Sequence, residues 1–220
     1  MTLIDGHLVI PEAGTGGGVL VIHSWWGLNA FFLDLCQRFA DEGFVALAAD
    51  LYGGKLATSV SEAKRLRKAV TASRKEPVYK YLTRMIQFLS AHESVCTPKI
   101  AVVGFSMGGH WACWLAQRPE LPIVATTIFY AVRNGDYSKS ASSFLGHFAE
   151  TDEWVSVSGV RKLRRSLEKA GREFAFHTYP GTSHWFFERD RTDVFNPEAS
   201  QLAWERTVDF TNKALKPKMA

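Results

Sequence analysis

The segment that most constrains the fold is residues 99–112, KIAVVGFSMGGHWA, where an apolar run breaks into a Gly-x-Ser-x-Gly turn. The run predicts a buried strand, and the residues after the turn predict a helix. Side chains at Gly104 and Gly108 would collide where strand and helix cross. A serine in such a turn stands exposed above the sheet, with a helix N-terminus pointing at it. Ser106 is therefore the candidate nucleophile, and the alternative is an ordinary strand–helix turn with an incidental serine.

Apolar runs alternate with helical patterns along the rest of the chain. Further strands are expected at residues 7–11, 19–22, 44–48, 123–130, 143–149 and 173–179. Further helices are expected at residues 31–42, 59–73, 78–92, 157–170 and 197–215. A glycine-rich turn is expected over residues 14–18, and Pro77 is expected to separate two helices. Continuous apolar strands are typical of a parallel sheet covered on both faces. The prediction is a single α/β domain over residues 1–220, with a doubly wound, mostly parallel sheet.

Composition argues against several kinds of partner. The 26 Lys and Arg residues are interleaved with 22 acidic residues for a net charge of +4, and the basic clusters at residues 64–68 and 161–165 have the helical spacing of solvated faces. We therefore expect no nucleic-acid partner. No apolar stretch approaches the length of a membrane span and the N-terminus lacks a secretory signal, so no membrane partner and a cytoplasmic location are expected. The three cysteines, Cys36, Cys96 and Cys113, lack metal spacing, which predicts buried, reduced thiols and no metal.

The partners of Ser106 should follow other strands, because reactive groups of a parallel sheet lie beyond the carboxyl ends of its strands. In chain order they should be an acid and then a histidine. Among seven histidines, His184 follows the last expected strand in a turn-rich loop, and it is the candidate base. Asp152, just past the strand over residues 143–149, is the preferred acid. Glu150 is the alternative acid, and His23 is a rival base that precedes the serine in the chain.

Acyl transfer also needs N–H donors for the developing oxyanion. The backbone N–H of Met107 directly follows the nucleophile, and that of Trp25 lies after the strand over residues 19–22. These two are the expected donors. Seven further residues are candidates for the substrate pocket, with loop or core packing as the alternative for each: Ser24, Trp26, Tyr130, Arg133, Trp185, Phe186 and Arg189.

Taken together, residues 23–29 (HSWWGLN), 49–54 (ADLYGG), 104–109 (GFSMGG) and 179–184 (YPGTSH), with Asp152, resemble the dienelactone hydrolase family over nearly the whole chain. The resemblance implies a compact α/β-hydrolase fold without a lid domain. It also implies hydrolysis of small esters or lactones such as carboxymethylenebutenolide. Matching the family motifs gives the same serine, aspartate and histidine as the topology argument.

The sequence departs from the family pattern at two positions. Many members carry a cysteine nucleophile, with a glutamate in the first oxyanion loop that helps control the thiolate; here Ser106 and Ser24 take these positions. The two changes are mutually consistent, because a serine hydroxyl is activated by its histidine. Members that hydrolyse dienelactone hold the substrate carboxylate with arginines, and Glu188 stands at one such position, with Arg189 next to it. Generic small-ester hydrolysis is therefore favoured over dienelactone hydrolysis.

The expected activity is hydrolysis of a small ester or lactone through an acyl-enzyme, without cofactor or metal, by a monomer or homodimer. Three alternatives remain. The protein could be a carboxymethylenebutenolidase proper, a hydrolase of acyl-thioesters or peptide-like substrates, or a non-catalytic α/β-hydrolase-fold protein that binds a ligand or a protein.

Overall fold

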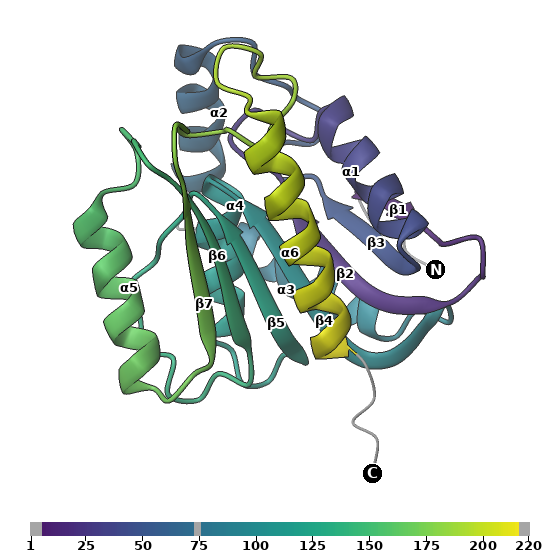
Figure 1. Cartoon of the computed structure of the whole chain (residues 1–220). Coiled ribbons are helices and arrows are strands. Elements are labelled where there is room, and N and C mark those ends of the chain that lie inside the picture. Colours follow the sequence, from purple (N-terminus) through teal and green to yellow (C-terminus); the bar gives the residue numbers. More distant parts are fainter. Residues whose placement is uncertain (1–5, 73–75, 216–220) are drawn as a thin grey trace.

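The computed structural model describes residues 6–72 and 76–215, which form one seven-stranded sheet with helices on both faces (Figure 1). The strands are β1 (Gly6–Val9), β2 (Gly16–Ile22), β3 (Phe44–Ala49), β4 (Val95–Phe105), β5 (Ile123–Phe129), β6 (Ser143–Ala149) and β7 (Phe174–Tyr179). Their order in the sheet is β1-β3-β2-β4-β5-β6-β7. Only β1 runs antiparallel to its neighbour among these strands. The predicted doubly wound, mostly parallel sheet is confirmed.

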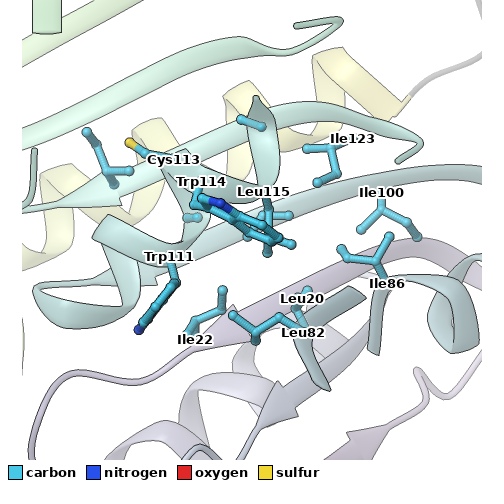
Figure 2. Packing of buried hydrophobic residues seen from close by; sticks show 14 of the residues in the cluster. Leu20, Ile22, Leu82, Ile86, Ile100, Trp111, Cys113, Trp114, Leu115 and Ile123 are labelled. Atoms are coloured by element: carbon cyan, nitrogen blue, oxygen red, sulfur yellow. The ribbon is translucent and has the colours of Figure 1, made fainter. Parts of the chain in front are cut away.

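The helices divide between the two faces of the sheet. They are α1 (Ala30–Asp41), α2 (Val60–Ala72), α3 (Glu76–Ser90), α4 (Met107–Ala116), α5 (Val157–Lys169) and α6 (Pro197–Leu215). Because side chains alternate along a strand, Val19 and Val21 of β2 pack with α1 and α6, whereas Leu20 and Ile22 pack with α3 and α4. Figure 2 shows the second of these cores, where Leu20 and Ile22 lie near Leu82 of α3. Burial on both faces explains the uninterrupted apolar strands.

Two details of the predicted secondary structure are wrong. Gly16–Gly18 belong to β2 rather than to a turn, because β2 and β3 approach so closely that a Cβ at Gly16 would lie 2.1 Å from the carbonyl oxygen of Gly43. Pro77 lies inside the first turn of α3, where its missing N–H costs no hydrogen bond. The last residue of the helix expected over residues 59–73 lies outside the described residues.

The cysteines do not all match the expectation of buried thiols. Cys36 and Cys113 are buried, and burial raises the pKa of each thiol to about 12. Cys96, near the start of β4, is exposed, because the first residues of this long strand extend beyond the covered part of the sheet. In the described ranges, no helix has the length and apolar character needed to span a membrane.

Two buried histidines are held neutral in the interior. His147 of β6 bonds Tyr179 Oη at 2.7 Å and Thr207 Oγ1 at 3.1 Å. Burial, with smaller contributions from His177 and Arg206, holds the pKa of His147 well below 6.5. Burial also lowers the pKa of His23 to about 4.

The free energy of unfolding is therefore expected to fall as the pH drops from 6.5 towards 4. In this window the unfolded chain protonates both histidines, whereas the folded chain keeps them neutral. Each contributes a slope of up to about 1.4 kcal/mol per pH unit. Urea unfolding at a series of pH values should show a shallower slope for His147→Asn than for the parent. Equal slopes in the two proteins would contradict the assignment of His147.

Candidate active site

Ser106 lies at the tight turn between β4 and α4. Its backbone has φ 49° and ψ −111°, a strained conformation for a residue with a side chain. A Cβ at Gly104 would lie 2.4 Å from the carbonyl oxygen of Gly108, and a Cβ at Gly108 would lie 2.1 Å from that of Ile22. The two glycines thus allow α4 to pass close to β4 and β2, as the sequence predicts. The turn leaves the Ser106 side chain in a cavity beyond the carboxyl end of β4.

A continuous hydrogen-bonded chain joins Ser106, His184 and Asp152. Ser106 Oγ lies 2.8 Å from His184 Nε2, and His184 Nδ1 lies 2.8 and 2.9 Å from the two carboxylate oxygens of Asp152. The backbone N–H groups of Trp154 and Val155 donate to Asp152 Oδ1 at 2.8 Å and fix the carboxylate. An ionised Asp152 can only accept, so His184 carries its proton on Nδ1 and turns the lone pair of Nε2 towards the serine hydroxyl. This arrangement can remove a proton from Ser106.

The alternative acid and the rival base lie elsewhere. Glu150 Oε2 accepts a hydrogen bond from the Gly181 N–H at 2.9 Å, so this carboxylate braces the turn after β7. His23 bonds the carbonyl oxygen of Ser24 through Nδ1 and accepts from the Leu51 N–H through Nε2 at 3.0 Å. Nε2 of His23 thus joins the end of β2 to the segment after β3, whereas the Nδ1 contact stays within the loop after β2.

The two expected oxyanion donors border the same space as Ser106 and His184. Met107 is the first residue of α4, and N–H groups in the first turn of a helix have no partner within that helix. Trp25 follows the end of β2, the strand next to β4. Donation from these two amides to a reacting carbonyl stays a prediction.

The cavity that contains Ser106 has a volume of about 360 Å³ and largely aromatic walls. Its lining residues are Trp25, Arg67, Ser106, Met107, His110, Trp111, Tyr130, Ala131, Val132, Trp154, Val155, His184 and Trp185. Two of the seven pocket candidates, Tyr130 and Trp185, belong to this lining. The volume suits a small ligand.

The other five candidates lie outside this lining. Ser24 is buried, Phe186 belongs to the core packed against α1 and α6, and Arg189 pairs with Asp34 at 3.1 Å. Trp26 packs against Trp185 at 5.3 Å between ring centroids, one layer behind the wall.

Arg133 is likewise placed behind a lining residue, because its guanidinium contacts Nε2 of His110. Seven lining residues were missed by the sequence reasoning, namely His110, Trp111, Ala131, Val132 and Val155, together with Arg67 and Trp154. Arg67 belongs to the basic cluster assigned to a solvated face, and Trp154 lies two positions after the candidate acid. The position of Trp154 could have been predicted, since a residue so close to Asp152 must lie near His184.

Glu188 is completely buried, although it stands at a position where the resemblance implies a substrate-binding arginine. Ser24 Oγ donates to its Oε2 at 2.8 Å, and Tyr130 Oη donates to its Oε1 at 2.6 Å. Burial raises the pKa of Glu188 to about 8 despite these two bonds. Its carboxyl group therefore ties together the loops that carry Trp25, Tyr130 and His184, and does not line the cavity.

Replacing Glu188 with glutamine should produce a difference in stability that depends on pH. Between pH 4.5 and about 8, the unfolded chain releases the Glu188 proton while the folded chain retains it, so this group reduces stability as the pH rises. Glutamine cannot ionise. The variant should therefore gain stability relative to the parent by up to about 1.4 kcal/mol per pH unit across this window. Chemical denaturation at pH 5 and pH 8 measures the change, and a difference independent of pH would count against a buried, protonated carboxyl group.

The parallel sheet, the strained serine at the turn and the hydrogen-bonded serine, histidine and aspartate define an α/β-hydrolase. The family model of the dienelactone hydrolase family matches residues 4–215, so the chain belongs to this family. It is a hydrolase of carboxylic esters or lactones. Among the residues described, no three His, Cys, Asp or Glu side chains form a group able to hold a metal ion.

Curated relatives resemble the chain over nearly its whole length. Protein usf of Aquifex pyrophilus is 32% identical over 219 residues, covering 96% of this chain and 94% of that protein. A protein of Aquifex aeolicus, provisionally named carboxymethylenebutenolidase, is 30% identical and covers 97% of this chain and 94% of its own length.

A solved structure shows the same fold. It is a dienelactone hydrolase-like promiscuous phosphotriesterase from metagenomic libraries, with a TM-score of 0.85, 20% identity, and coverage of 96% of this chain and 92% of that one.

Proposed function

We propose that Ser106, His184 and Asp152 are the catalytic triad of a small-ester and lactone hydrolase that works through an acyl-enzyme. The observation that carries this proposal is the unbroken chain of hydrogen bonds from the Ser106 hydroxyl to the Asp152 carboxylate. The strained backbone of Ser106 and the burial of His184 support the proposal, because both features fix the positions of Ser106 Oγ and His184 Nε2.

In the first half-reaction, Ser106 Oγ attacks the carbonyl carbon while His184 Nε2 takes the hydroxyl proton. The negative charge moves to the carbonyl oxygen, which the Met107 and Trp25 amides stabilise. Collapse of this intermediate breaks the bond to the alcohol, which leaves with the proton from His184. In the second half-reaction, water gives a proton to His184 and attacks the acyl carbon. The bond from that carbon to Ser106 Oγ then breaks, Oγ takes the proton back from His184, and the acid is released. Asp152 holds the imidazole tautomer throughout, and neither half-reaction needs a metal or an organic cofactor.

A second candidate function is hydrolysis of lactones or esters that carry a carboxylate, as the carboxymethylenebutenolidase names of relatives suggest. Arg67 favours it, because its side chain lines the cavity and a guanidinium pairs well with a carboxylate. Glu188 argues against this second function, because a buried glutamate stands where the resemblance implies an arginine that binds the substrate carboxylate. Comparing kcat/KM for monomethyl succinate and methyl butyrate tests this point, and preference for the charged ester, lost in Arg67→Gln, would establish the second function.

Covalent labelling tests the proposed triad directly. A fluorophosphonate probe should add one phosphonyl group per chain, and peptide mapping should place the adduct on Ser106. Protein that has been heat-denatured before labelling is the control and should stay unmodified, because the hydroxyl then lacks its histidine. An unlabelled native protein, or an adduct on another serine, would favour the non-catalytic ligand-binding alternative.

A further inference from the structure

Three tryptophans from different loops meet on one wall of the cavity. The ring centroids of Trp25 and Trp154 lie 4.8 Å apart in an edge-to-face arrangement, and those of Trp25 and Trp185 lie 5.6 Å apart in a stacked one. Trp154 and Trp185 lie 6.0 Å apart. We call Trp25, Trp154 and Trp185 the indole wall. It is assembled from segments after β2, β6 and β7, so only the folded chain presents it.

The indole wall reaches the candidate base. The His184 ring meets Trp185 edge to face at 4.6 Å between centroids, and Trp154 lies 6.5 Å away. Trp25 is only 4% exposed, whereas Trp154 is 43% exposed and marks the outer end of the wall. A group attached to the reacting ester would therefore lie against indole rings on its way to solvent.

Positive charge borders this wall. Lys64 Nζ lies 5.5 Å from the centroid of the Trp154 ring, and Arg67 lines the cavity. Aromatic walls often bind quaternary ammonium groups, but here a lysine already uses the π-face of Trp154 and an arginine would repel a second cation. The surroundings thus disfavour a cationic group, so a neutral aromatic ring fits this wall better than a quaternary ammonium group.

We propose that the indole wall is the binding subsite for a flat, uncharged aromatic ring on the acyl or alcohol side of the substrate. This inference rests on the proposed function and names the substrate class of the same site. Flat rings pack edge to face or offset-stacked against indoles, and such pairs are stronger than burial of equal area would give. This extra stabilisation corresponds to a kcat/KM about 3- to 10-fold higher for an aromatic substrate than for one with a saturated ring of the same size.

Ring pairs matched in size and reactivity test the proposal. The pairs are benzyl acetate with cyclohexylmethyl acetate, and methyl phenylacetate with methyl cyclohexylacetate. In the parent, kcat/KM should favour the aromatic member of at least one pair by about 3- to 10-fold. Trp154→Leu should lower that ratio, because it removes the outer of the three rings and leaves the backbone N–H that donates to Asp152. Trp204→Phe is the control and should keep the parent ratio, since Trp204 packs against Phe39 in the core between the sheet and helices α1 and α6 and does not line the cavity.

A third pair tests the charge argument. Acetylcholine and 3,3-dimethylbutyl acetate have the same shape and differ in charge, and the neutral ester should be the better substrate. Ratios near 1 for both ring pairs in the parent, an unchanged ratio in Trp154→Leu, or a preference for acetylcholine would each overturn the aromatic subsite. If the fluorophosphonate adduct still forms on Ser106, only the subsite fails; if no adduct forms and no ester is hydrolysed, the proposed function fails with it.

Discussion

Asp152→Asn should lower kcat for a small ester by about 10,000-fold while the protein remains folded. The carboxylate accepts a hydrogen bond from the Nδ1–H of His184 at 2.8 Å, which leaves Nε2 free to take the proton of Ser106. An asparagine amide can instead donate to Nδ1, and the imidazole then carries its proton on Nε2, where it cannot act as a base. Initial rates measured with p-nitrophenyl acetate, together with circular dichroism, check this expectation.

Glu150→Gln is the matched control for this substitution. Glu150 lies two positions before Asp152 and was the alternative acid, but it contacts the Gly181 N–H, which a glutamine carbonyl can also accept. Its kcat should stay within about two-fold of the parent, since this surface bond contributes little to the site. If Glu150→Gln lost activity and Asp152→Asn kept it, the acid would have been assigned to the wrong residue.

Gly104→Ala should strongly destabilise the turn. The new Cβ would lie 2.4 Å from the Gly108 carbonyl oxygen and 2.7 Å from the Gly109 Cα, and backbone atoms of a buried helix cannot move aside as a side chain can. We expect a loss of about 3 kcal/mol or more in the free energy of unfolding. Urea denaturation measures the loss, and the rate of fluorophosphonate labelling should fall with it because α4 carries the turn.

Gly159→Ala offers the corresponding control in α5. Its Cβ would meet a side-chain methyl of Val132 at 3.2 Å and the Ser156 hydroxyl at 3.3 Å, and small side-chain movements relieve both contacts. Alanine also favours the helix relative to glycine, so the net change should stay within about 1 kcal/mol. Equal losses in the two variants would show that crowding at the turn is not what requires glycine at position 104.

Much of this molecule could be predicted from local pattern. β6 and α6 begin and end where hydrophobic periodicity and the proline at position 197 predict. The Gly-x-Ser-x-Gly pattern predicts the turn around Ser106, because only glycine at positions 104 and 108 tolerates the close crossing of α4 over β4. Asp152 and His184 follow from topology, since the carboxyl ends of parallel strands meet at one edge of the sheet.

The pocket could not be predicted in the same way, because side chains from separate loops build it. Arg67 has the sequence context of a solvated helix, yet its side chain lines the cavity. Arg189 was a candidate for the cavity but pairs with Asp34 of α1. The direction in which each side chain points depends on how loops pack, and no periodicity encodes it.

Local pattern alone predicts the order of strands and helices along the chain, the strained serine, the histidine that contacts it and, with Glu150 as the alternative, the aspartate that contacts the histidine. Each of these depends on short-range backbone sterics or on the rule that places loops at one end of a parallel sheet. Two further features emerge only in the folded chain: Glu188 is a buried partner of Ser24 and Tyr130, and tryptophans from three loops form one wall. These contacts join residues between 58 and 164 positions apart, and their burial depends on everything packed around them.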